Sequence, residues 1–98
     1  MKKVDEIKNK SIPVFNDYNV LSASLFGSMA RGDDKKNSDI DFLIKFSPDS
    51  GGLFVMVRLK RSLEKALKRK VDLLTYRSLN PHLKKYIMND AIKIYEKK

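Results

Sequence analysis

The chain has 98 residues, a length that fits one domain spanning residues 1–98. Hydrophobic residues make up 42% of the chain and charged residues 34%, and the formal net charge of +9 favours acidic or polyanionic partners. Because cysteine is absent and histidine occurs once, the composition excludes disulfides, thiolate zinc sites, cysteine nucleophiles and histidine-rich metal sites.

The first two predicted elements are a helix and a strand. Apolar side chains at helical spacing predict a short amphipathic helix over residues 4–17, interrupted or ended near Pro13. The uncharged run 19–26 ends at a glycine and predicts a central strand that is buried on both faces. We expect the helix to cover one face of a sheet that contains this strand.

A second strand, predicted over residues 39–46, carries two acids. Its apolar side chains alternate onto one face, so Asp39 and Asp41 share the other, about 7 Å apart at their α-carbons. Two carboxylates held this close repel each other unless a cation lies between them. Oxygen ligands alone suit a hard ion, so the pair predicts a site for Mg²⁺ or Mn²⁺.

The rest of the chain continues the alternation of helices and strands. Helical spacing predicts a helix over 53–69, and a strand follows over 70–75. A proline suited to a first turn begins a helix over 81–89, and alternating residues predict a last strand over 91–95. This order predicts an α/β (α+β) fold in which helices cover a small mixed β-sheet.

The pair Gly27-Ser28 lies between the first strand and a short helix predicted over residues 29–31. A glycine leaves backbone N–H groups unhindered, and a helix N-terminus with a hydroxyl beside it can bind phosphate. A phosphate site next to a metal site suggests a nucleoside triphosphate.

Two segments together resemble the signature of a known family. Leu25-Phe-Gly-Ser-Met-Ala-Arg-Gly is followed, after a polar spacer, by Asn37-Ser-Asp-Ile-Asp-Phe-Leu-Ile. The combination resembles the minimal nucleotidyltransferases, small members of the DNA polymerase β-like superfamily, over nearly the whole chain. The family has a third catalytic carboxylate on the next strand, and Asp72 stands in the matching setting. The resemblance implies the nucleotidyltransferase fold, similar to the polymerase β palm.

The resemblance also implies a role for each acid. Asp39 and Asp41 would hold the metal ion that carries the nucleotide, and Asp72 would complete a second metal site with them. In two-metal nucleotidyl transfer one Mg²⁺ ion activates the attacking hydroxyl and the other, about 3.5–4 Å away, neutralises the leaving pyrophosphate. The substrate implied is ATP.

The phosphate-binding residues follow from the same resemblance. Gly27 and Ser28 would grip the β- and γ-phosphates. Arg31 either pairs with a phosphate or anchors its loop to a carboxylate, and the sequence leaves both open. Gly32 is expected to end the short helix in a left-handed conformation. Tyr76 and Arg77 are candidates for the acceptor side of the site.

Residues 58–70 hold seven basic residues and the single acid Glu64, a net charge of +6. This segment is either a solvated helix face or a docking surface for an acidic partner or RNA. Its helix has Phe54 near its start and no other aromatic residue, whereas single-stranded nucleic acids stack on aromatic side chains. A protein partner is therefore favoured over nucleic acid.

The resemblance implies transfer of AMP from ATP to a hydroxyl, with a tyrosine of a HEPN-type ribonuclease toxin as acceptor and the chain as its antitoxin. A chain this small leaves no room for an acceptor-binding domain, so the acceptor is expected to dock by itself. The alternatives are a non-catalytic module that masks its partner, and a transferase acting on RNA or a small molecule. With no apolar run of about 20 residues and no signal-peptide core, we expect a cytoplasmic protein without membrane contact. A core this small also favours association with a partner or a second copy.

Overall fold

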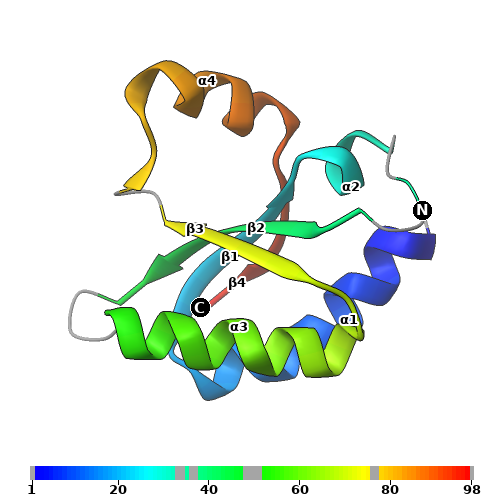
Figure 1. Ribbon diagram of the computed structural model, residues 1–98, viewed down its shortest axis with the longest axis vertical. Coiled ribbons are helices and arrows are strands. Elements are labelled where there is room, and N and C mark those ends of the chain that lie inside the picture. The colour runs from blue at the N-terminus through cyan, green and yellow to red at the C-terminus, as the bar shows by residue number, and fades with distance from the viewer. Residues whose placement is uncertain (1, 33–34, 36–37, 48–51, 76–77, 98) are drawn as a thin grey trace.

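The computed structural model describes residues 2–32, 35, 38–47, 52–75 and 78–97 (Figure 1). Its sheet has four strands in the order β3-β2-β1-β4, and β1 pairs antiparallel with both β2 and β4 while β2 and β3 are parallel. The strands are β1 (Val20–Phe26), β2 (Ile40–Phe46), β3 (Val71–Thr75) and β4 (Ile92–Glu96). The expected small mixed sheet is confirmed.

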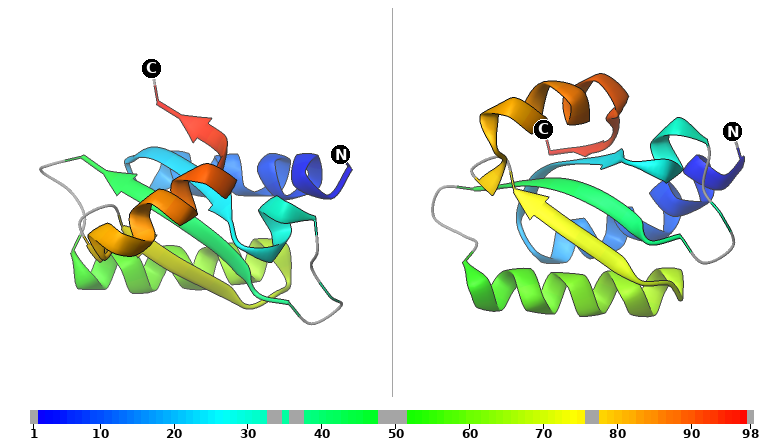
Figure 2. Two further views of the ribbon diagram at one scale, coloured as in Figure 1. Left: turned by 90° about the horizontal axis from the view of Figure 1, so that it is seen from above. Right: turned by 45° about the horizontal axis from the view of Figure 1, so that its top comes forward.

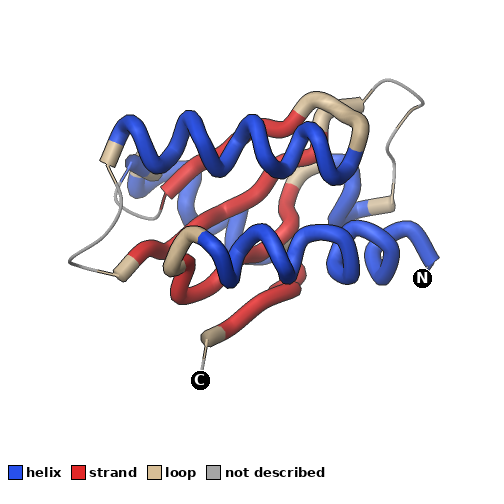
Figure 3. The backbone as a smooth tube through the Cα atoms, turned by 90° about the horizontal axis from the view of Figure 1, so that it is seen from below, coloured by secondary structure: helices blue, strands red, loops and turns tan. Residues whose placement is uncertain are grey.

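The described residues form four helices, and three of them cover the two faces of this sheet. The four helices are α1 (Lys2–Asp17), α2 (Ser28–Arg31), α3 (Leu53–Leu67) and α4 (Pro81–Asp90). α1 and α3 lie side by side on one face, and α4 lies over the other (Figure 2). Seen from below, α1 and α3 together cover that face of the sheet (Figure 3).

The hydrophobic core lies between the sheet and the pair α1 and α3. Leu59 and Leu63 of α3 are fully buried, as the four-residue spacing of a helix face requires. From α1, the buried ring of Phe15 meets that of Phe42 edge to face, with centroids 5.6 Å apart. Because side chains alternate along a strand, the burial of Phe42 on this face places its neighbour Asp41 on the opposite one.

The expected break of the first helix at Pro13 is wrong, because α1 continues through it to Asp17. Proline lacks the N–H that would donate to the carbonyl four residues earlier, on Asn9. Both residues are exposed, so water can satisfy that carbonyl. The buried Phe15, one turn from the helix end, stabilises the last turn by packing in the core.

The other predicted elements are confirmed within two residues at each end. The long helix ends at Leu67 because Lys68 adopts a left-handed conformation, φ 56°, and its N–H donates to the Glu64 carbonyl at 2.8 Å. The last helix begins as expected: Asn80 caps it by accepting from the His82 N–H at 2.9 Å. Within the described residues, no helix combines the length and the apolar character that crossing a membrane would require.

Candidate active site

The two acids on strands are brought together by the parallel pairing of β2 and β3. Asp41 and Asp72 are direct partners in that register, so their side chains project from the same face of the sheet. Asp39 lies one residue before β2 and is exposed. Its position two residues before Asp41 directs it toward the same side. Residues from two separate strands therefore form one acidic site.

The acids interact electrostatically. Partial burial raises the pKa of the Asp41 carboxyl, and the nearby charges of Asp72 and Asp39 raise it further. Arg31 acts in the opposite direction and lowers that pKa, but its effect is smaller. The site therefore disfavours its own negative charge, which a bound cation would relieve.

Gly27 lies against this acidic site. Phe26 pairs with Asp41 across β1 and β2, so the chain leaving β1 passes the carboxylate directly. Gly27 has a φ of 72°, and a Cβ atom built on it would lie 2.4 Å from Asp41 Oδ2. Glycine is favoured here, because L side chains rarely adopt this backbone conformation and a Cβ atom would force the Asp41 carboxylate to shift.

Helix α2 begins at Ser28, one residue earlier than expected, and its buried Met29 packs into the core. Gly32 ends the helix in the left-handed conformation, with φ 81°, and its N–H donates to the Ser28 carbonyl at 2.9 Å. This expectation is confirmed. The short helix is thus fixed on the sheet with its N-terminus, Ser28, next to the acids.

Arg31 pairs with a carboxylate that the sequence did not single out. Its Nη1 lies 3.6 Å from Oδ2 of Asp90, the last residue of α4. Of the two roles left open for Arg31, the structure shows the pairing with a carboxylate. Asp90 lies 59 positions along the chain from Arg31, and no local pattern marks it as a partner.

The donor set fits a hard divalent cation, since it consists of oxygen atoms only. In the described part of the chain, no three acidic, histidine or cysteine side chains already stand close enough to hold a metal ion. The structure therefore offers the neighbours Asp41 and Asp72, with the exposed Asp39 at the edge of the site. Phosphate oxygens of a nucleotide would supply further ligands, as is usual for Mg²⁺.

Two polar side chains at the end of α3 hold the strands that carry the acids. Glu64 Oε2 accepts from the N–H of Val71, the residue before Asp72, at 3.0 Å. Arg69 Nη2 donates to the carbonyl of Ser38, the residue before Asp39, at 2.5 Å. Sequence reasoning counted both only as charges of the basic segment. The isolated acid among seven basic residues was the one available signal for Glu64.

Tyr76 and Arg77, the candidates for the acceptor side, lie outside the described residues. The part of the basic segment that lies on α3 is away from the acids, because α3 covers the face opposite the one from which Asp41 projects, whereas Arg69 and Lys70 lie between α3 and β3, close to the start of β2. Apart from the half-buried Arg69, the basic side chains of the segment are exposed.

Relatives with similar sequences carry names that agree with this arrangement. A protein of Methanocaldococcus jannaschii described as a putative protein adenylyltransferase is 45% identical over 91 residues, 93% of this chain and 97% of the relative. The protein adenylyltransferase MntA of Thermococcus cleftensis is 31% identical over 75 residues, 76% of this chain and 75% of MntA.

The fold of this chain is also similar to that of a protein of known structure. A chain in a crystal structure of a toxin-antitoxin with AMP-PNP has a TM-score of 0.78 and 27% identity, over 93% of this chain and 74% of that one. The family model described as polymerase beta, nucleotidyltransferase matches residues 9–98. With the acids and the Gly27-Ser28 turn side by side on this fold, the chain belongs to the polymerase beta nucleotidyltransferase family.

Proposed function

We propose that this nucleotidyltransferase moves AMP from ATP onto a hydroxyl group of a protein. The observation that carries the proposal is the pairing of Asp41 with Asp72 beside Gly27, where a bound cation and a triphosphate would meet. Two relatives are named protein adenylyltransferases, and one structural neighbour is a toxin-antitoxin with AMP-PNP. The acceptor we propose is a tyrosine of a HEPN-type ribonuclease toxin in the cytoplasm, where ATP is available.

In the proposed reaction the acids bind the cation, and Gly27 and Ser28 bind the phosphates. Asp39, Asp41 and Asp72 would hold Mg²⁺, which when bound activates the acceptor hydroxyl and neutralises the leaving pyrophosphate. The bare backbone of Gly27 and the N–H and hydroxyl of Ser28 bind phosphate oxygens.

The reaction exchanges one phosphorus–oxygen bond for another. The acceptor oxygen forms a bond to the α-phosphorus as the bond to the β-phosphate oxygen breaks, so pyrophosphate leaves and the hydroxyl proton passes to a neighbouring carboxylate or to solvent. Holding both reactants in line beside the acids is the main task of the fold.

The test uses the purified protein, the product of the neighbouring gene, Mg²⁺ and ATP labelled at the α-phosphate. We expect label on a tyrosine of the partner, identified by mass spectrometry, and its loss with Asp39→Ala, Asp41→Ala or Asp72→Ala. Asp5→Ala is the matched control, since Asp5 is an exposed acid on α1. Its label should equal that of the wild type.

Two alternatives give different results in the same experiment. A module that only masks its partner would neutralise it equally well with Asp39→Ala or Asp41→Ala, and no label would appear. A transferase acting on RNA or a small molecule would form labelled product without any protein acceptor.

A further inference from the structure

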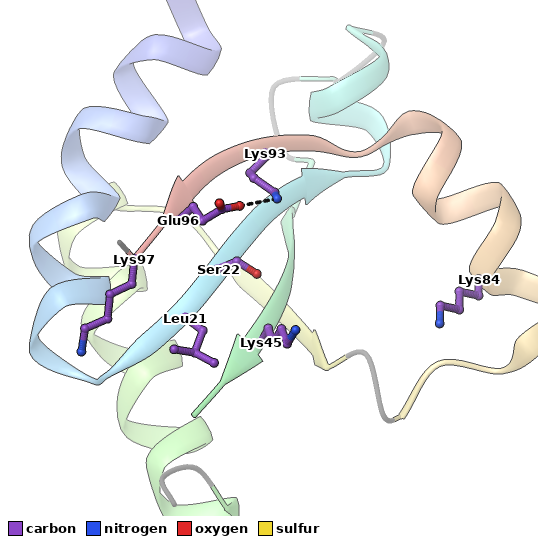
Figure 4. Close-up of a pocket in the computed structure, with 7 residues that line it drawn as sticks. All are labelled: Leu21, Ser22, Lys45, Lys84, Lys93, Glu96 and Lys97. Atoms are coloured by element: carbon purple, nitrogen blue, oxygen red, sulfur yellow. Dashed lines mark hydrogen bonds and ion pairs between the residues drawn. The ribbon is translucent and has the colours of Figure 1, made fainter. Parts of the chain in front are cut away.

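A cleft of about 670 Å³ is lined by residues of β1, β2, β4 and α4 (Figure 4). Lysines from separate elements line it: Lys45 from β2, Lys93 from β4, Lys84 from α4 and Lys97 just after β4. Among the described residues of its lining, Glu96 is the one acid. The family's catalytic pattern does not include these residues, so the cleft is a feature apart from the acidic site.

The charge of the cleft is not balanced from within. The Glu96 carboxylate is paired with Lys93, and this bond lowers the pKa of Glu96, so the acid is ionised at neutral pH. Among the described residues, the side chains of Lys45, Lys84 and Lys97 form no ion pair with a carboxylate. Lys45 also acts on Glu96 through its charge, so the four lysines and one carboxylate of the described lining leave a net charge of +3 toward an acidic ligand.

The cleft and the candidate active site lie on the same face of the sheet. Lys45 is four residues beyond Asp41 on β2, so both side chains project toward the α4 side. At about 3.3 Å per residue the two positions are about 13 Å apart along the strand. An extended peptide of about four residues spans that distance.

The surface beside the cleft favours a protein ligand. Helix α4, which carries Lys84, has no buried residue and exposes three large apolar side chains: Leu83 (54% exposed), Tyr86 (72%) and Met88 (44%). Aromatic residues and methionine are enriched at the contact surfaces of proteins. Lysines next to such side chains suit an acidic segment with apolar residues.

We infer that this cleft binds an acidic segment of the acceptor protein about four residues from the hydroxyl that receives AMP. The inference deepens the proposed function and rests on its protein acceptor. Binding in the cleft would orient the acceptor, because a segment anchored there extends along β2 to the acids.

The test measures binding without ATP, by fluorescence anisotropy of labelled peptides. One peptide carries a tyrosine with three glutamates beginning four residues away, and the other has glutamines in their place. We expect the wild type to bind the glutamate peptide about tenfold more tightly, the combined effect of two or three exposed ion pairs. The double variant Lys45→Glu/Lys84→Glu should lose this preference.

The matched control is Lys60→Glu/Lys65→Glu, which makes the same charge change at exposed positions of α3 on the other face. It should keep most of the preference at physiological ionic strength. Equal affinity of the wild type for both peptides, or an equal loss in both double variants, would overturn the inference. Displacement of the glutamate peptide by an RNA of equal charge at lower concentration would also overturn it, in favour of nucleic acid.

Adding labelled ATP and Mg²⁺ separates this inference from the proposed function. If the peptide binds in the cleft but no label reaches its tyrosine or the intact partner, the proposed transfer fails and the cleft assignment stands. If the partner is labelled equally well by the wild type and Lys45→Glu/Lys84→Glu, the transfer stands and the cleft assignment fails.

Discussion

Gly27 is held by two constraints, its positive φ of 72° and the Asp41 carboxylate 2.4 Å from where a Cβ would lie. Gly32 shares only the first, since its φ is 81° but no atom lies within 4 Å of its Cβ position. We predict that Gly27→Ala and Gly32→Ala each lose about 1–2 kcal/mol of stability from backbone strain. Only Gly27→Ala should also lose AMP transfer, by at least about 100-fold, because the methyl group displaces Asp41.

Thermal unfolding and label incorporation on the partner, measured side by side, check this pair of variants. Equal activity of the two variants would mean that the close approach of Gly27 to Asp41 does not matter for transfer.

Asp41 carries a prediction about pH. Its pKa is raised in the folded state, so ionising it costs stability as pH rises from the unfolded value, about 3.9, through the folded one. At neutral pH this cost is fully present. Asp41→Asn should therefore raise the Tm of the metal-free protein by about 2–5 °C at pH 7, while transfer is lost.

Melting curves of the wild type and Asp41→Asn, with and without Mg²⁺, test whether the substitution raises or lowers the Tm. The advantage of Asp41→Asn should shrink as pH falls toward 3.9, and Mg²⁺ should stabilise the wild type but not the variant. A variant less stable than the metal-free wild type at pH 7 would contradict the repulsion we infer.

At the scale of elements, the link between α3 and β3 positions an acid of the site. Glu64 on α3 accepts from the Val71 N–H at the start of β3, one residue before Asp72. Glu64→Ala should cost about 1–3 kcal/mol, because it leaves a partly buried N–H without its partner. AMP transfer should also fall in Glu64→Ala, because Asp72 shifts when the bond to Val71 is lost.

Glu64→Gln is the control, since its amide oxygen can accept the same bond. It should recover most of the stability in denaturant unfolding and most of the transfer. If Glu64→Gln is as impaired as Glu64→Ala, the charge of Glu64 matters rather than the bond to Val71.

The sequence predicted the elements well because their signals are local. Alternation along residues 39–46 placed Asp41 on the face opposite the core, and the glycines marked both ends of α2. The predicted helix break at Pro13 was wrong because the cost of its missing N–H depends on whether the unpaired carbonyl is exposed and on the packing of nearby residues. A local sequence pattern contains neither. The partner of Arg31 was missed because it depends on α2 meeting the distant α4, and that of Glu64 because the turn between α3 and β3 decides which N–H the carboxylate reaches.

At the scale of the whole molecule, the net charge of +9 divides between two surfaces on opposite faces of the sheet. One is the basic stretch of α3 and the other is the cleft that contains Lys45 and Lys84. The acids lie on the same face as the cleft, at the end of the sheet where β1 meets α2. A basic protein thus presents the candidate acids and the lysines of the cleft on one face of its sheet, where both can contact the same ligand.

The described elements share one sheet and one core, so ligand binding at the acids should stabilise the whole molecule. We predict a single cooperative unfolding transition, in which MgATP at about 100 times its Kd adds about 2.7 kcal/mol and raises the Tm by about 10–20 °C. Asp41→Asn/Asp72→Asn should abolish that increase, because two of the proposed ligands of the cation are lost, and EDTA should abolish it in the wild type. Calorimetry measures both effects. Two transitions would contradict a single folding unit, and an increase that survives in the double variant would place ATP at another site.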